Sequence, residues 1–259
     1  MKRKENARVC GINELAPGIF SLWLESSMAA EAKPGCFVGV YPKNGAHVLM
    51  RPISICDVNA QKTQLRLVFR AAGEGTKEIS GLRVGEEVAL LGVLGNGYDT
   101  QAMQGKKLLL LGGGIGIPPM LLLAKELSDA GISCNAVLGY ADRNDFLRDE
   151  FDNVCRTYVA TMDGSLGTKG TVIDALNENM LMADICCACG PMPMLKAVKG
   201  FAADCGMKAY LSLEERMACG VGACLGCVTK TAHPDPHTHV NNTRICVEGP
   251  VFDASEVLL

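Results

Sequence analysis

This 259-residue sequence shows no pattern typical of a membrane span, a leader peptide or a basic tract. The longest uncharged run, LLLLGGGIGIPPMLLLA between Lys107 and Lys125, is broken by four glycines and two prolines and is too short to cross a bilayer as a helix. The start, MKRKENARVC, leads into no apolar run with a cleavage site, so we expect a cytoplasmic protein whose thiols stay reduced. Because the net charge is −3 and no lysine- or arginine-rich tract occurs, no nucleic-acid partner is expected, and function should lie in pockets.

Cysteine, in contrast, is plentiful, and four of the thirteen cysteines form a pattern. Cys219, Cys224 and Cys227 have C-x4-C-x2-C spacing, and Cys246 follows nineteen positions later. This spacing is typical of plant-type [2Fe–2S] proteins, in which three ligands share a loop and the fourth comes from a distant strand. Small residues would let the loop wrap closely around a cluster and aim N–H groups at its sulfurs: Gly220, Gly222, Ala223 and Gly226.

Other roles for these cysteines are weaker hypotheses. Disulfides do not fit a reducing compartment, and the step from Cys219 to Cys224 is too wide for the tightest zinc knuckle, although zinc binding or plain core packing stays open. His233, His237 and His239 could suggest Rieske-type ligands, but four cysteines already suffice, and solvated loop positions are the simpler interpretation. Nine other cysteines remain: Cys10, Cys36, Cys56, Cys134, Cys155, Cys186, Cys187, Cys189 and Cys205. Most of them have apolar neighbours and are expected to be small core residues.

The pattern of hydrophobic residues divides the chain into three parts. Up to about Gly97, short alternating segments such as GIFSLWLES, QLRLVFRA and EEVALLGVLG predict a closed or nearly closed antiparallel β-barrel. From Gln101 to about Met207, strand-like and helix-like segments alternate, which predicts a parallel sheet of βαβ units. The last part shows no long helical period and forms a small unit around the cysteine loop. The predicted boundaries are 1–99, 100–208 and 209–259.

A glycine-rich turn opens the parallel-sheet part. In LLLLGGGIGIPPMLLLAKEL a strand leads through Gly112, Gly113, Gly114 and Gly116 into a helix, and such a turn can approach a phosphate closely. Ile117 stands where the third glycine of a G-x-G-x-x-G motif would be, so nucleotide binding and simple strand-to-helix packing both remain open.

A second turn, CACGPMPML, ends a later strand, and both turns should lie at the carboxyl ends of parallel strands, where ligands of such sheets bind. Cys186 and Cys189 form a C-x-x-C, but Cys186 sits inside the apolar strand DICCACG. A buried core position is therefore favoured over a thiol redox site.

The barrel part contains two further candidate segments, MRPIS and GEGTKEIS. Arg51 could pair with a phosphate, and Ser54 could donate a hydrogen bond. Gly73, Gly75 and Thr76 open a predicted short helix whose first amides could receive an anion.

In this order, Arg-Pro-Ile-Ser, Gly-Glu-Gly-Thr, Gly-Gly-Gly-Ile-Gly-Ile-Pro-Pro and Cys-Gly-Pro-Met, the motifs resemble the ferredoxin–NADP reductase superfamily over nearly all of the first 210 residues. The resemblance implies an FAD-binding barrel, a Rossmann-like nucleotide-binding domain and a small C-terminal cluster domain. It implies FAD contacts from Arg51, Pro52, Ile53, Ser54, Val68, Phe69, Arg70, Gly75 and Thr76. It implies nicotinamide-nucleotide contacts from Gly112, Gly113, Gly114, Gly116, Gly190, Pro191 and Met192, with Cys189 as the candidate catalytic residue.

The segments LSLEERMACGVGACLGC and CVEGPVF narrow the resemblance to the electron-transfer subunits of dihydroorotate dehydrogenase B. This resemblance makes Cys219, Cys224, Cys227 and Cys246 the cluster ligands, although the gap before Cys246 is a little longer than we expect for the family. It implies a partner subunit with FMN that oxidises dihydroorotate, in a heterotetramer with two copies of each chain. Electrons would pass from FMN through the cluster and FAD to NAD⁺ in pyrimidine biosynthesis, because a flavin exchanges either one or two electrons.

Two alternatives share the three-part layout or the cluster. The chain could be the electron-transfer subunit of an NAD(P)H-linked hydrogenase or of a ferredoxin–NADP transhydrogenase. A non-catalytic iron–sulfur sensor is a more distant alternative. NAD is expected over NADP, because Asp142 would repel a 2′-phosphate, although Arg143 could attract one.

Overall fold

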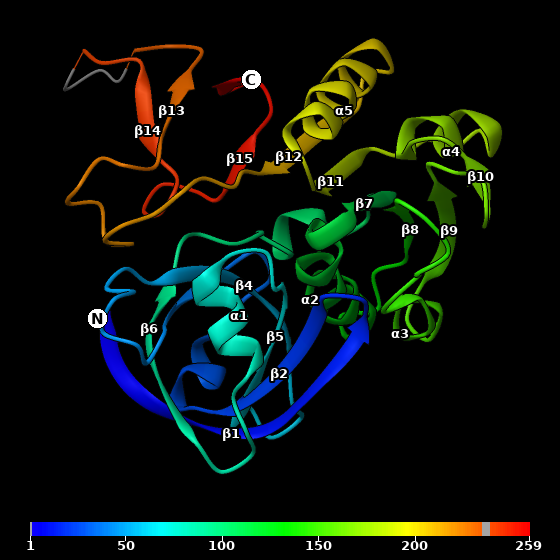
Figure 1. Cartoon of the computed structure of the whole chain (residues 1–259). Coiled ribbons are helices and arrows are strands. Elements are labelled where there is room, and N and C mark those ends of the chain that lie inside the picture. The colour runs from blue at the N-terminus through cyan, green and yellow to red at the C-terminus, as the bar shows by residue number, and fades with distance from the viewer. Residues whose placement is uncertain (1, 235–238) are drawn as a thin grey trace.

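A computed structural model describes residues 2–234 and 239–259. It consists of a barrel, a helix-covered sheet and a small C-terminal unit, which lie side by side (Figure 1). No helix in these residues is long and apolar enough to span a membrane.

The N-terminal part is a closed antiparallel barrel, as predicted, with the strand order β1-β2-β5-β4-β3-β6. Its strands are β1 (Arg3–Ala16), β2 (Ile19–Glu25), β3 (Phe37–Tyr41), β4 (Arg51–Val58), β5 (Gln64–Arg70) and β6 (Glu87–Leu94). The barrel part also holds one α-helix, α1 (Glu74–Ser80), and two 3-10 turns, η1 (Ser27–Glu31) and η2 (Gln101–Met103). The longest strand, β1, has no counterpart among the predicted segments, because only Ala7 and Val9 of its RKENARVCGINELA are buried.

The second part is a seven-stranded sheet with the order β10-β9-β8-β7-β11-β12-β15. Six strands are parallel neighbours: β7 (Leu108–Gly113), β8 (Cys134–Tyr140), β9 (Arg156–Thr161), β10 (Thr168–Lys169), β11 (Ile185–Cys189) and β12 (Lys208–Ser212). Its helices are α2 (Ile117–Asp129), preceded by the 3-10 turn η3 (Gly114–Gly116), then α3 (Arg148–Asp152), α4 (Val172–Glu178) and α5 (Met192–Asp204). The predicted parallel sheet of βαβ units is confirmed.

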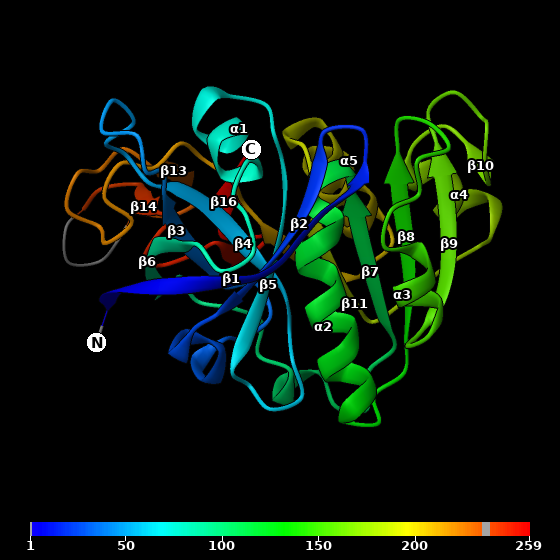
Figure 2. The same ribbon diagram turned by 60° about the horizontal axis from the view of Figure 1, so that its bottom comes forward.

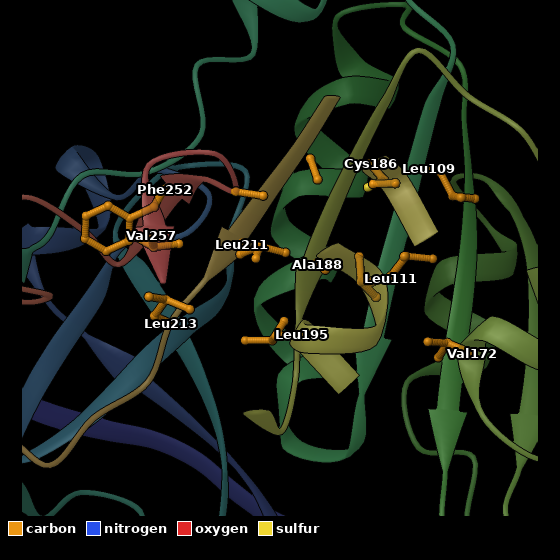
Figure 3. Packing of buried hydrophobic residues seen from close by; sticks show 14 of the residues in the cluster. Leu109, Leu111, Val172, Cys186, Ala188, Leu195, Leu211, Leu213, Phe252 and Val257 are labelled. Atoms are coloured by element: carbon orange, nitrogen blue, oxygen red, sulfur yellow. The ribbon is translucent and has the colours of Figure 1, made fainter. Parts of the chain in front are cut away.

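Side chains alternate between two cores on the faces of this sheet. Leu109 and Leu111 of β7 pack with α4 and α5 on one face (Figure 3). Leu108 and Leu110 face α2 on the other. Because α2 lies between the sheet and barrel strand β4, as Figure 2 shows, it is buried over most of its length, which accounts for the long apolar run in the sequence.

Charged side chains also join the barrel to α2 and α3. Lys125 of α2 pairs with Asp57 of β4. Arg66 of β5 donates two hydrogen bonds of 2.8 Å from Nη1 to the carboxylate of Glu150 in α3. Asp57 and Arg66 are only 6% and 7% exposed, so this seam between the two parts contains buried charges that depend on their partners.

The C-terminal unit contains a three-stranded sheet, β14-β13-β16, built from β13 (Val228–Thr231), β14 (Asn242–Arg244) and β16 (Val257–Leu258). Its remaining strand, β15 (Val251–Asp253), leaves this unit and pairs antiparallel with β12 at the edge of the seven-stranded sheet. Phe252 of β15 and Val257 of β16 pack with Leu211 and Leu213, so one core continues from the sheet into the C-terminal unit (Figure 3).

Candidate functional site

The carboxyl edge of the parallel sheet brings the two predicted turns together. Gly112 of β7 is the register partner of Cys189 of β11, which in turn pairs with Ser212 of β12. A side chain on Gly116 would collide with the backbone of Cys189. Contact between the two turns therefore depends on the glycine that ends η3.

On the barrel side, Arg51 lies against helix α1. Its Nη1 donates to the carbonyl of Leu49 at 2.5 Å, and its guanidinium occupies the space that a side chain on Gly75 would need. Thr76 closes the start of the predicted short helix, because its Oγ1 accepts from Gly73 N at 3.0 Å. The sequence therefore places a permanent cation beside the first turn of α1.

A cavity of about 520 Å³ opens between these two groups of residues. Ten predicted site residues line it, all but Cys189 from the barrel part: Arg51, Pro52, Ile53, Ser54, Val68, Phe69, Arg70, Gly73, Thr76 and Cys189. The other predicted residues of the two turns lie outside its wall: Gly112, Gly113, Gly114, Gly116, Gly190, Pro191 and Met192. Gly75 also lies outside the wall, and a side chain at this position would collide with the Arg51 guanidinium.

The remaining wall comes from residues that the sequence analysis did not assign to a binding site. Phe37 is the register partner of Ser54, and Ile115 belongs to the glycine turn between β7 and α2. The end of β12 and the segment that follows it contribute Ser212, Leu213, Glu214, Glu215, Arg216 and Met217, and Ala72 and Pro250 complete the wall. This segment runs directly into the cysteine loop, and its sequence LEERM offers no periodicity by which to recognise a binding surface.

Cys189 borders the cavity as a neutral thiol. Burial raises the pKa of Cys189 to about 12, against the effect of a hydrogen bond with Ser212, and Glu214 raises it further. Cys186 lies in the core on the opposite face of β11, as expected from the two-residue period of a strand. The C-x-x-C is therefore not a thiol pair, which confirms the core interpretation of Cys186.

The cavity fits a large, mostly apolar ligand with an anionic end. Its apolar wall includes Ile53, Val68 and Phe69, and Phe69 stacks on Phe20 with 6.2 Å between ring centroids. Two guanidinium groups, of Arg51 and Arg70, stand at its edge, and Arg70 also reaches the region of the glycine turn. An isoalloxazine ring with a pyrophosphate tail has this chemistry.

The four cysteines of the predicted cluster motif form two pairs of neighbouring thiols. Cys219 and Cys224 are hydrogen-bond neighbours, as are Cys227 and Cys246. No three potential ligands within residues 2–234 and 239–259 are placed to share a single metal ion. The two pairs match a cluster with two irons, each held by two cysteines.

Backbone N–H groups surround the first pair. Val221 N and Cys224 N donate to Cys219 Sγ at 3.5 Å and 3.4 Å, and Gly226 N donates to Cys224 Sγ at 3.4 Å. Such donors around cysteine sulfur stabilise the thiolates that bind iron.

The two pairs also differ in charge. Burial opposes ionisation of Cys219, but the hydrogen bonds of Val221, Cys224 and Ala223 outweigh it and lower the pKa of Cys219 to about 6. Burial and the neighbouring Cys227 thiol raise the pKa of Cys246 to about 12. Without a metal, Cys219 is therefore a thiolate near neutral pH whereas Cys246 is protonated, and metal binding would have to release the proton of Cys246.

The backbone of the cysteine loop depends on glycine. Gly220 and Gly222 have φ of +68° and +82°. A side chain on Gly222 would also meet Val247, next to Cys246. Ile245 N donates to the carbonyl of Cys227 at 3.0 Å, which brings the fourth cysteine to the loop.

The predictions of solvated histidines and of small core cysteines hold in part. His233 and His239 are exposed, as expected for solvated loop residues, and His237 lies outside the described residues. Among the nine other cysteines, Cys36, Cys56, Cys186 and Cys187 are buried. The other five are partly buried: Cys134, Cys155, Cys189 and Cys205 pack against the cores of the parallel sheet, whereas Cys10 belongs to none of the core clusters, so the core interpretation is wrong only for Cys10. Most of the five lie where a strand or helix begins or ends, positions that local apolar neighbours do not distinguish from core.

Comparison with known proteins agrees with this geometry. Residues 214–258 match the family model for the iron–sulfur cluster binding domain of dihydroorotate dehydrogenase B. The electron-transfer subunit of dihydroorotate dehydrogenase B (NAD⁺) from Geobacillus sp. (strain WCH70) is 41% identical over 263 aligned positions, which cover 100% of both chains. The chain belongs to the family of dihydroorotate dehydrogenase B electron-transfer subunits. The family member from Bacillus pumilus is 40% identical, with 99% of both chains covered.

Solved structures extend the similarity to related electron-transfer proteins. The NADH-dependent reduced ferredoxin-NADP oxidoreductase described for flavin-based electron bifurcation has a TM-score of 0.86 and 29% identity, covering 97% of this chain and 89% of the other. A ferredoxin NADP⁺ reductase from Neisseria gonorrhoeae, solved with FAD and NADP, has a TM-score of 0.66 and 16% identity over 82% of this chain and 94% of its own. The second similarity supports the fold of the barrel and the parallel sheet.

Proposed function

We propose that this chain carries electrons between an FMN-containing subunit that oxidises dihydroorotate and NAD⁺, through a [2Fe–2S] cluster and FAD. One observation carries the proposal: a single cavity is bordered by the barrel motif, by Cys189 at the nucleotide turn and by the segment 212–217 that leads into the cysteine loop. When bound, the three groups would supply complementary chemistry, because NAD(H) exchanges two electrons as hydride, the cluster exchanges one and FAD exchanges either.

The barrel residues would hold the flavin. Arg51 would pair with the FAD pyrophosphate beside Gly75 and Thr76, because a guanidinium binds phosphate with charge-assisted hydrogen bonds. Ser54 would donate to the ring edge. The apolar side chains of Pro52, Ile53, Val68 and Phe69 would cover the ring, and Arg70 would stand between the flavin and the glycine turn.

The nucleotide would enter at the carboxyl edge of the sheet. The turns Gly112–Gly116 and Cys189–Met192 would bind it. The glycines of these turns pack closely and carry no side chains, so their backbone N–H groups could approach the phosphates of the nucleotide. Cys189, a neutral thiol in the cavity wall, would lie where hydride moves between nicotinamide and flavin.

NAD is the proposed nucleotide. Asp142, whose carboxylate is held by Asn144 N and Nδ2 at 2.9 Å and 2.7 Å, would repel a 2′-phosphate.

Cys219, Cys224, Cys227 and Cys246 would bind the cluster. Two thiol pairs, several N–H donors and left-handed glycines make this loop suited to two irons. We propose a cytoplasmic heterotetramer, with two FMN subunits and two copies of this chain.

The similarity to the NADH-dependent reduced ferredoxin-NADP oxidoreductase is also compatible with the transhydrogenase alternative. The full-length identity of 41% to the dihydroorotate dehydrogenase relative, against 29% to that oxidoreductase, favours dihydroorotate.

Cofactor analysis combined with a dye assay tests the proposal. The purified chain should contain one FAD, two irons and two acid-labile sulfides, and it should reduce an artificial acceptor with NADH at a higher kcat/KM than with NADPH. Zinc in place of iron, or a preference for NADPH, would contradict the corresponding part of the proposal. A sensor without catalytic function would carry no flavin and would not oxidise NADH.

A further inference from the structure

A short turn after Cys246 connects the cluster motif to the flavin cavity. Cys246 is 1% exposed and lies at one end of this turn. At the other end, Pro250 is part of the cavity wall, immediately before β15 joins the parallel sheet. The position of residues 247–250 therefore determines how far the fourth cysteine lies from the cavity.

The barrel holds this turn through Asn96, two residues after β6. Its side-chain Nδ2 donates to the carbonyls of Val247 and Glu248 at 2.9 Å and 3.1 Å. Its backbone N donates to the carbonyl of Gly249 at 2.6 Å. Asn96 thus satisfies three consecutive carbonyls of the turn from a different part of the molecule.

Two neighbouring contacts show that the fit is close. A side chain on Gly95 would collide with Pro250 and would come within 3.0 Å of the Gly249 carbonyl. Leu213 N, in the segment that lines the cavity, donates to the Pro250 carbonyl at 2.8 Å. The turn is therefore fixed to the sheet side by backbone pairing, whereas the side-chain amide and the backbone N of Asn96 fix it to the barrel.

We propose that Asn96 is a positioning residue for electron transfer, which fixes the cluster-bearing turn at a set distance from the flavin cavity. The inference rests on the proposed function. Electron transfer between two centres slows steeply as their separation grows, so a turn released from the barrel would affect this step more than hydride transfer at the other end of the flavin. The amide matters because its N–H₂ group has two donor hydrogens, one for each of the two carbonyls.

The test compares Asn96→Ala and Asn96→Asp with Asn179→Ala in the intact chain. Asn179 is a matched control, since its Nδ2 also donates to a backbone carbonyl, that of Ala175 at 3.0 Å, but far from the cavity in the nucleotide part. Both Asn96 variants should keep wild-type FAD, iron and sulfide content. Amide hydrogen exchange of peptides covering 245–253 should accelerate in both, and not in the control.

Rapid mixing with NADH separates the two electron steps. Flavin bleaching should keep its wild-type rate in the Asn96 variants, while reduction of the cluster should slow at least about tenfold. Asn96→Asp should be slower than Asn96→Ala, because its carboxylate faces two carbonyl oxygens. The inference would be overturned if the Asn96 variants reduced the cluster at the wild-type rate and showed unchanged amide hydrogen exchange. Equal slowing of flavin bleaching and cluster reduction would also overturn it. Failure of wild-type protein to bind FAD or reduce its cluster would instead contradict the proposed function.

Discussion

The flavin cavity and the cysteine loop differ in what holds them in shape. The barrel side of the cavity is walled by residues of β3, β4, β5 and α1, whose positions follow from the closed barrel. The cysteine loop has no strand between Cys219 and Cys227 and depends on left-handed glycines and single N–H donors to sulfur. A regular fold can preform a site by itself, whereas a loop of this kind needs the metal to complete its structure.

The largest expected effect comes from removing a cluster ligand. Cys246→Ser should abolish or strongly reduce iron and sulfide binding and leave FAD bound at wild-type stoichiometry, because Cys246 lies outside the cavity wall. Iron, sulfide and flavin analysis of the purified variant checks this. Cys205→Ser, in neither site, should retain all three, and unchanged iron and sulfide in Cys246→Ser would remove that residue from the ligand set.

The converse change should weaken FAD binding and leave cluster binding unchanged. Gly75→Ala places a methyl group where the Arg51 guanidinium now lies, so the arginine must move away from the first turn of α1. Loss of a charge-assisted contact to phosphate should reduce FAD affinity about tenfold to a hundredfold. The control is Gly200→Ala, where a new methyl group would meet no atom within 4 Å. Equal FAD dissociation constants in the two variants would contradict the role of Arg51.

A smaller effect is expected at the seam between barrel and sheet. Lys125→Met leaves the buried Asp57 without its cation, which should lower the free energy of unfolding by about 1–3 kcal/mol and Tm by several degrees. Thermal unfolding followed by circular dichroism measures this. Lys208→Met, which removes a half-exposed pair with Asp253, should shift Tm by much less. Similar shifts in both variants would show that the seam is no more sensitive than the surface.

The smallest effect concerns the loop between β3 and β4. Burial opposes ionisation of Glu78, but hydrogen bonds from His47 and from the backbone of Asn44 and Lys43 lower its pKa below the usual 4.5. A depressed carboxyl pKa stabilises the fold above about pH 4.5, and this contribution disappears as the pH falls through the folded-state value. Wild type should exceed Glu78→Gln in Tm by roughly a degree or two at pH 7, and the two should converge near pH 3. A difference that persists at pH 3 would contradict ionic tethering of this loop.

The sequence predicts much of the difference between the barrel and the cysteine loop. Alternating segments predicted the barrel, the glycine turn predicted the strand-to-helix transition at Gly112–Gly116, and cysteine spacing predicted the loop. These signals are local, since each depends on residues close together in the chain.

The rest depends on contacts between distant segments. Strand β1 gave little signal because most of its side chains face solvent, and nothing in VFD indicates that β15 joins β12 in another sheet. The segment 212–217 lines the cavity only because β12 ends beside Cys189. Gly75 was predicted as a flavin contact, but its place behind Arg51 follows from the packing of α1 on β4.

The most direct test of the account is NADH formation from dihydroorotate and NAD⁺, measured with this chain alone and after mixing with a matching FMN subunit. Hydride exchange needs only the nucleotide turns and the flavin, whereas dihydroorotate oxidation needs a second flavin pocket with its own general base. The isolated chain should reduce dyes with NADH but should form no NADH from dihydroorotate and NAD⁺. The mixture with the FMN subunit should form NADH from them. NADH formation from dihydroorotate by the isolated chain would contradict the account. An inert mixture would also contradict it, if the chain instead exchanged electrons with a hydrogenase or ferredoxin partner.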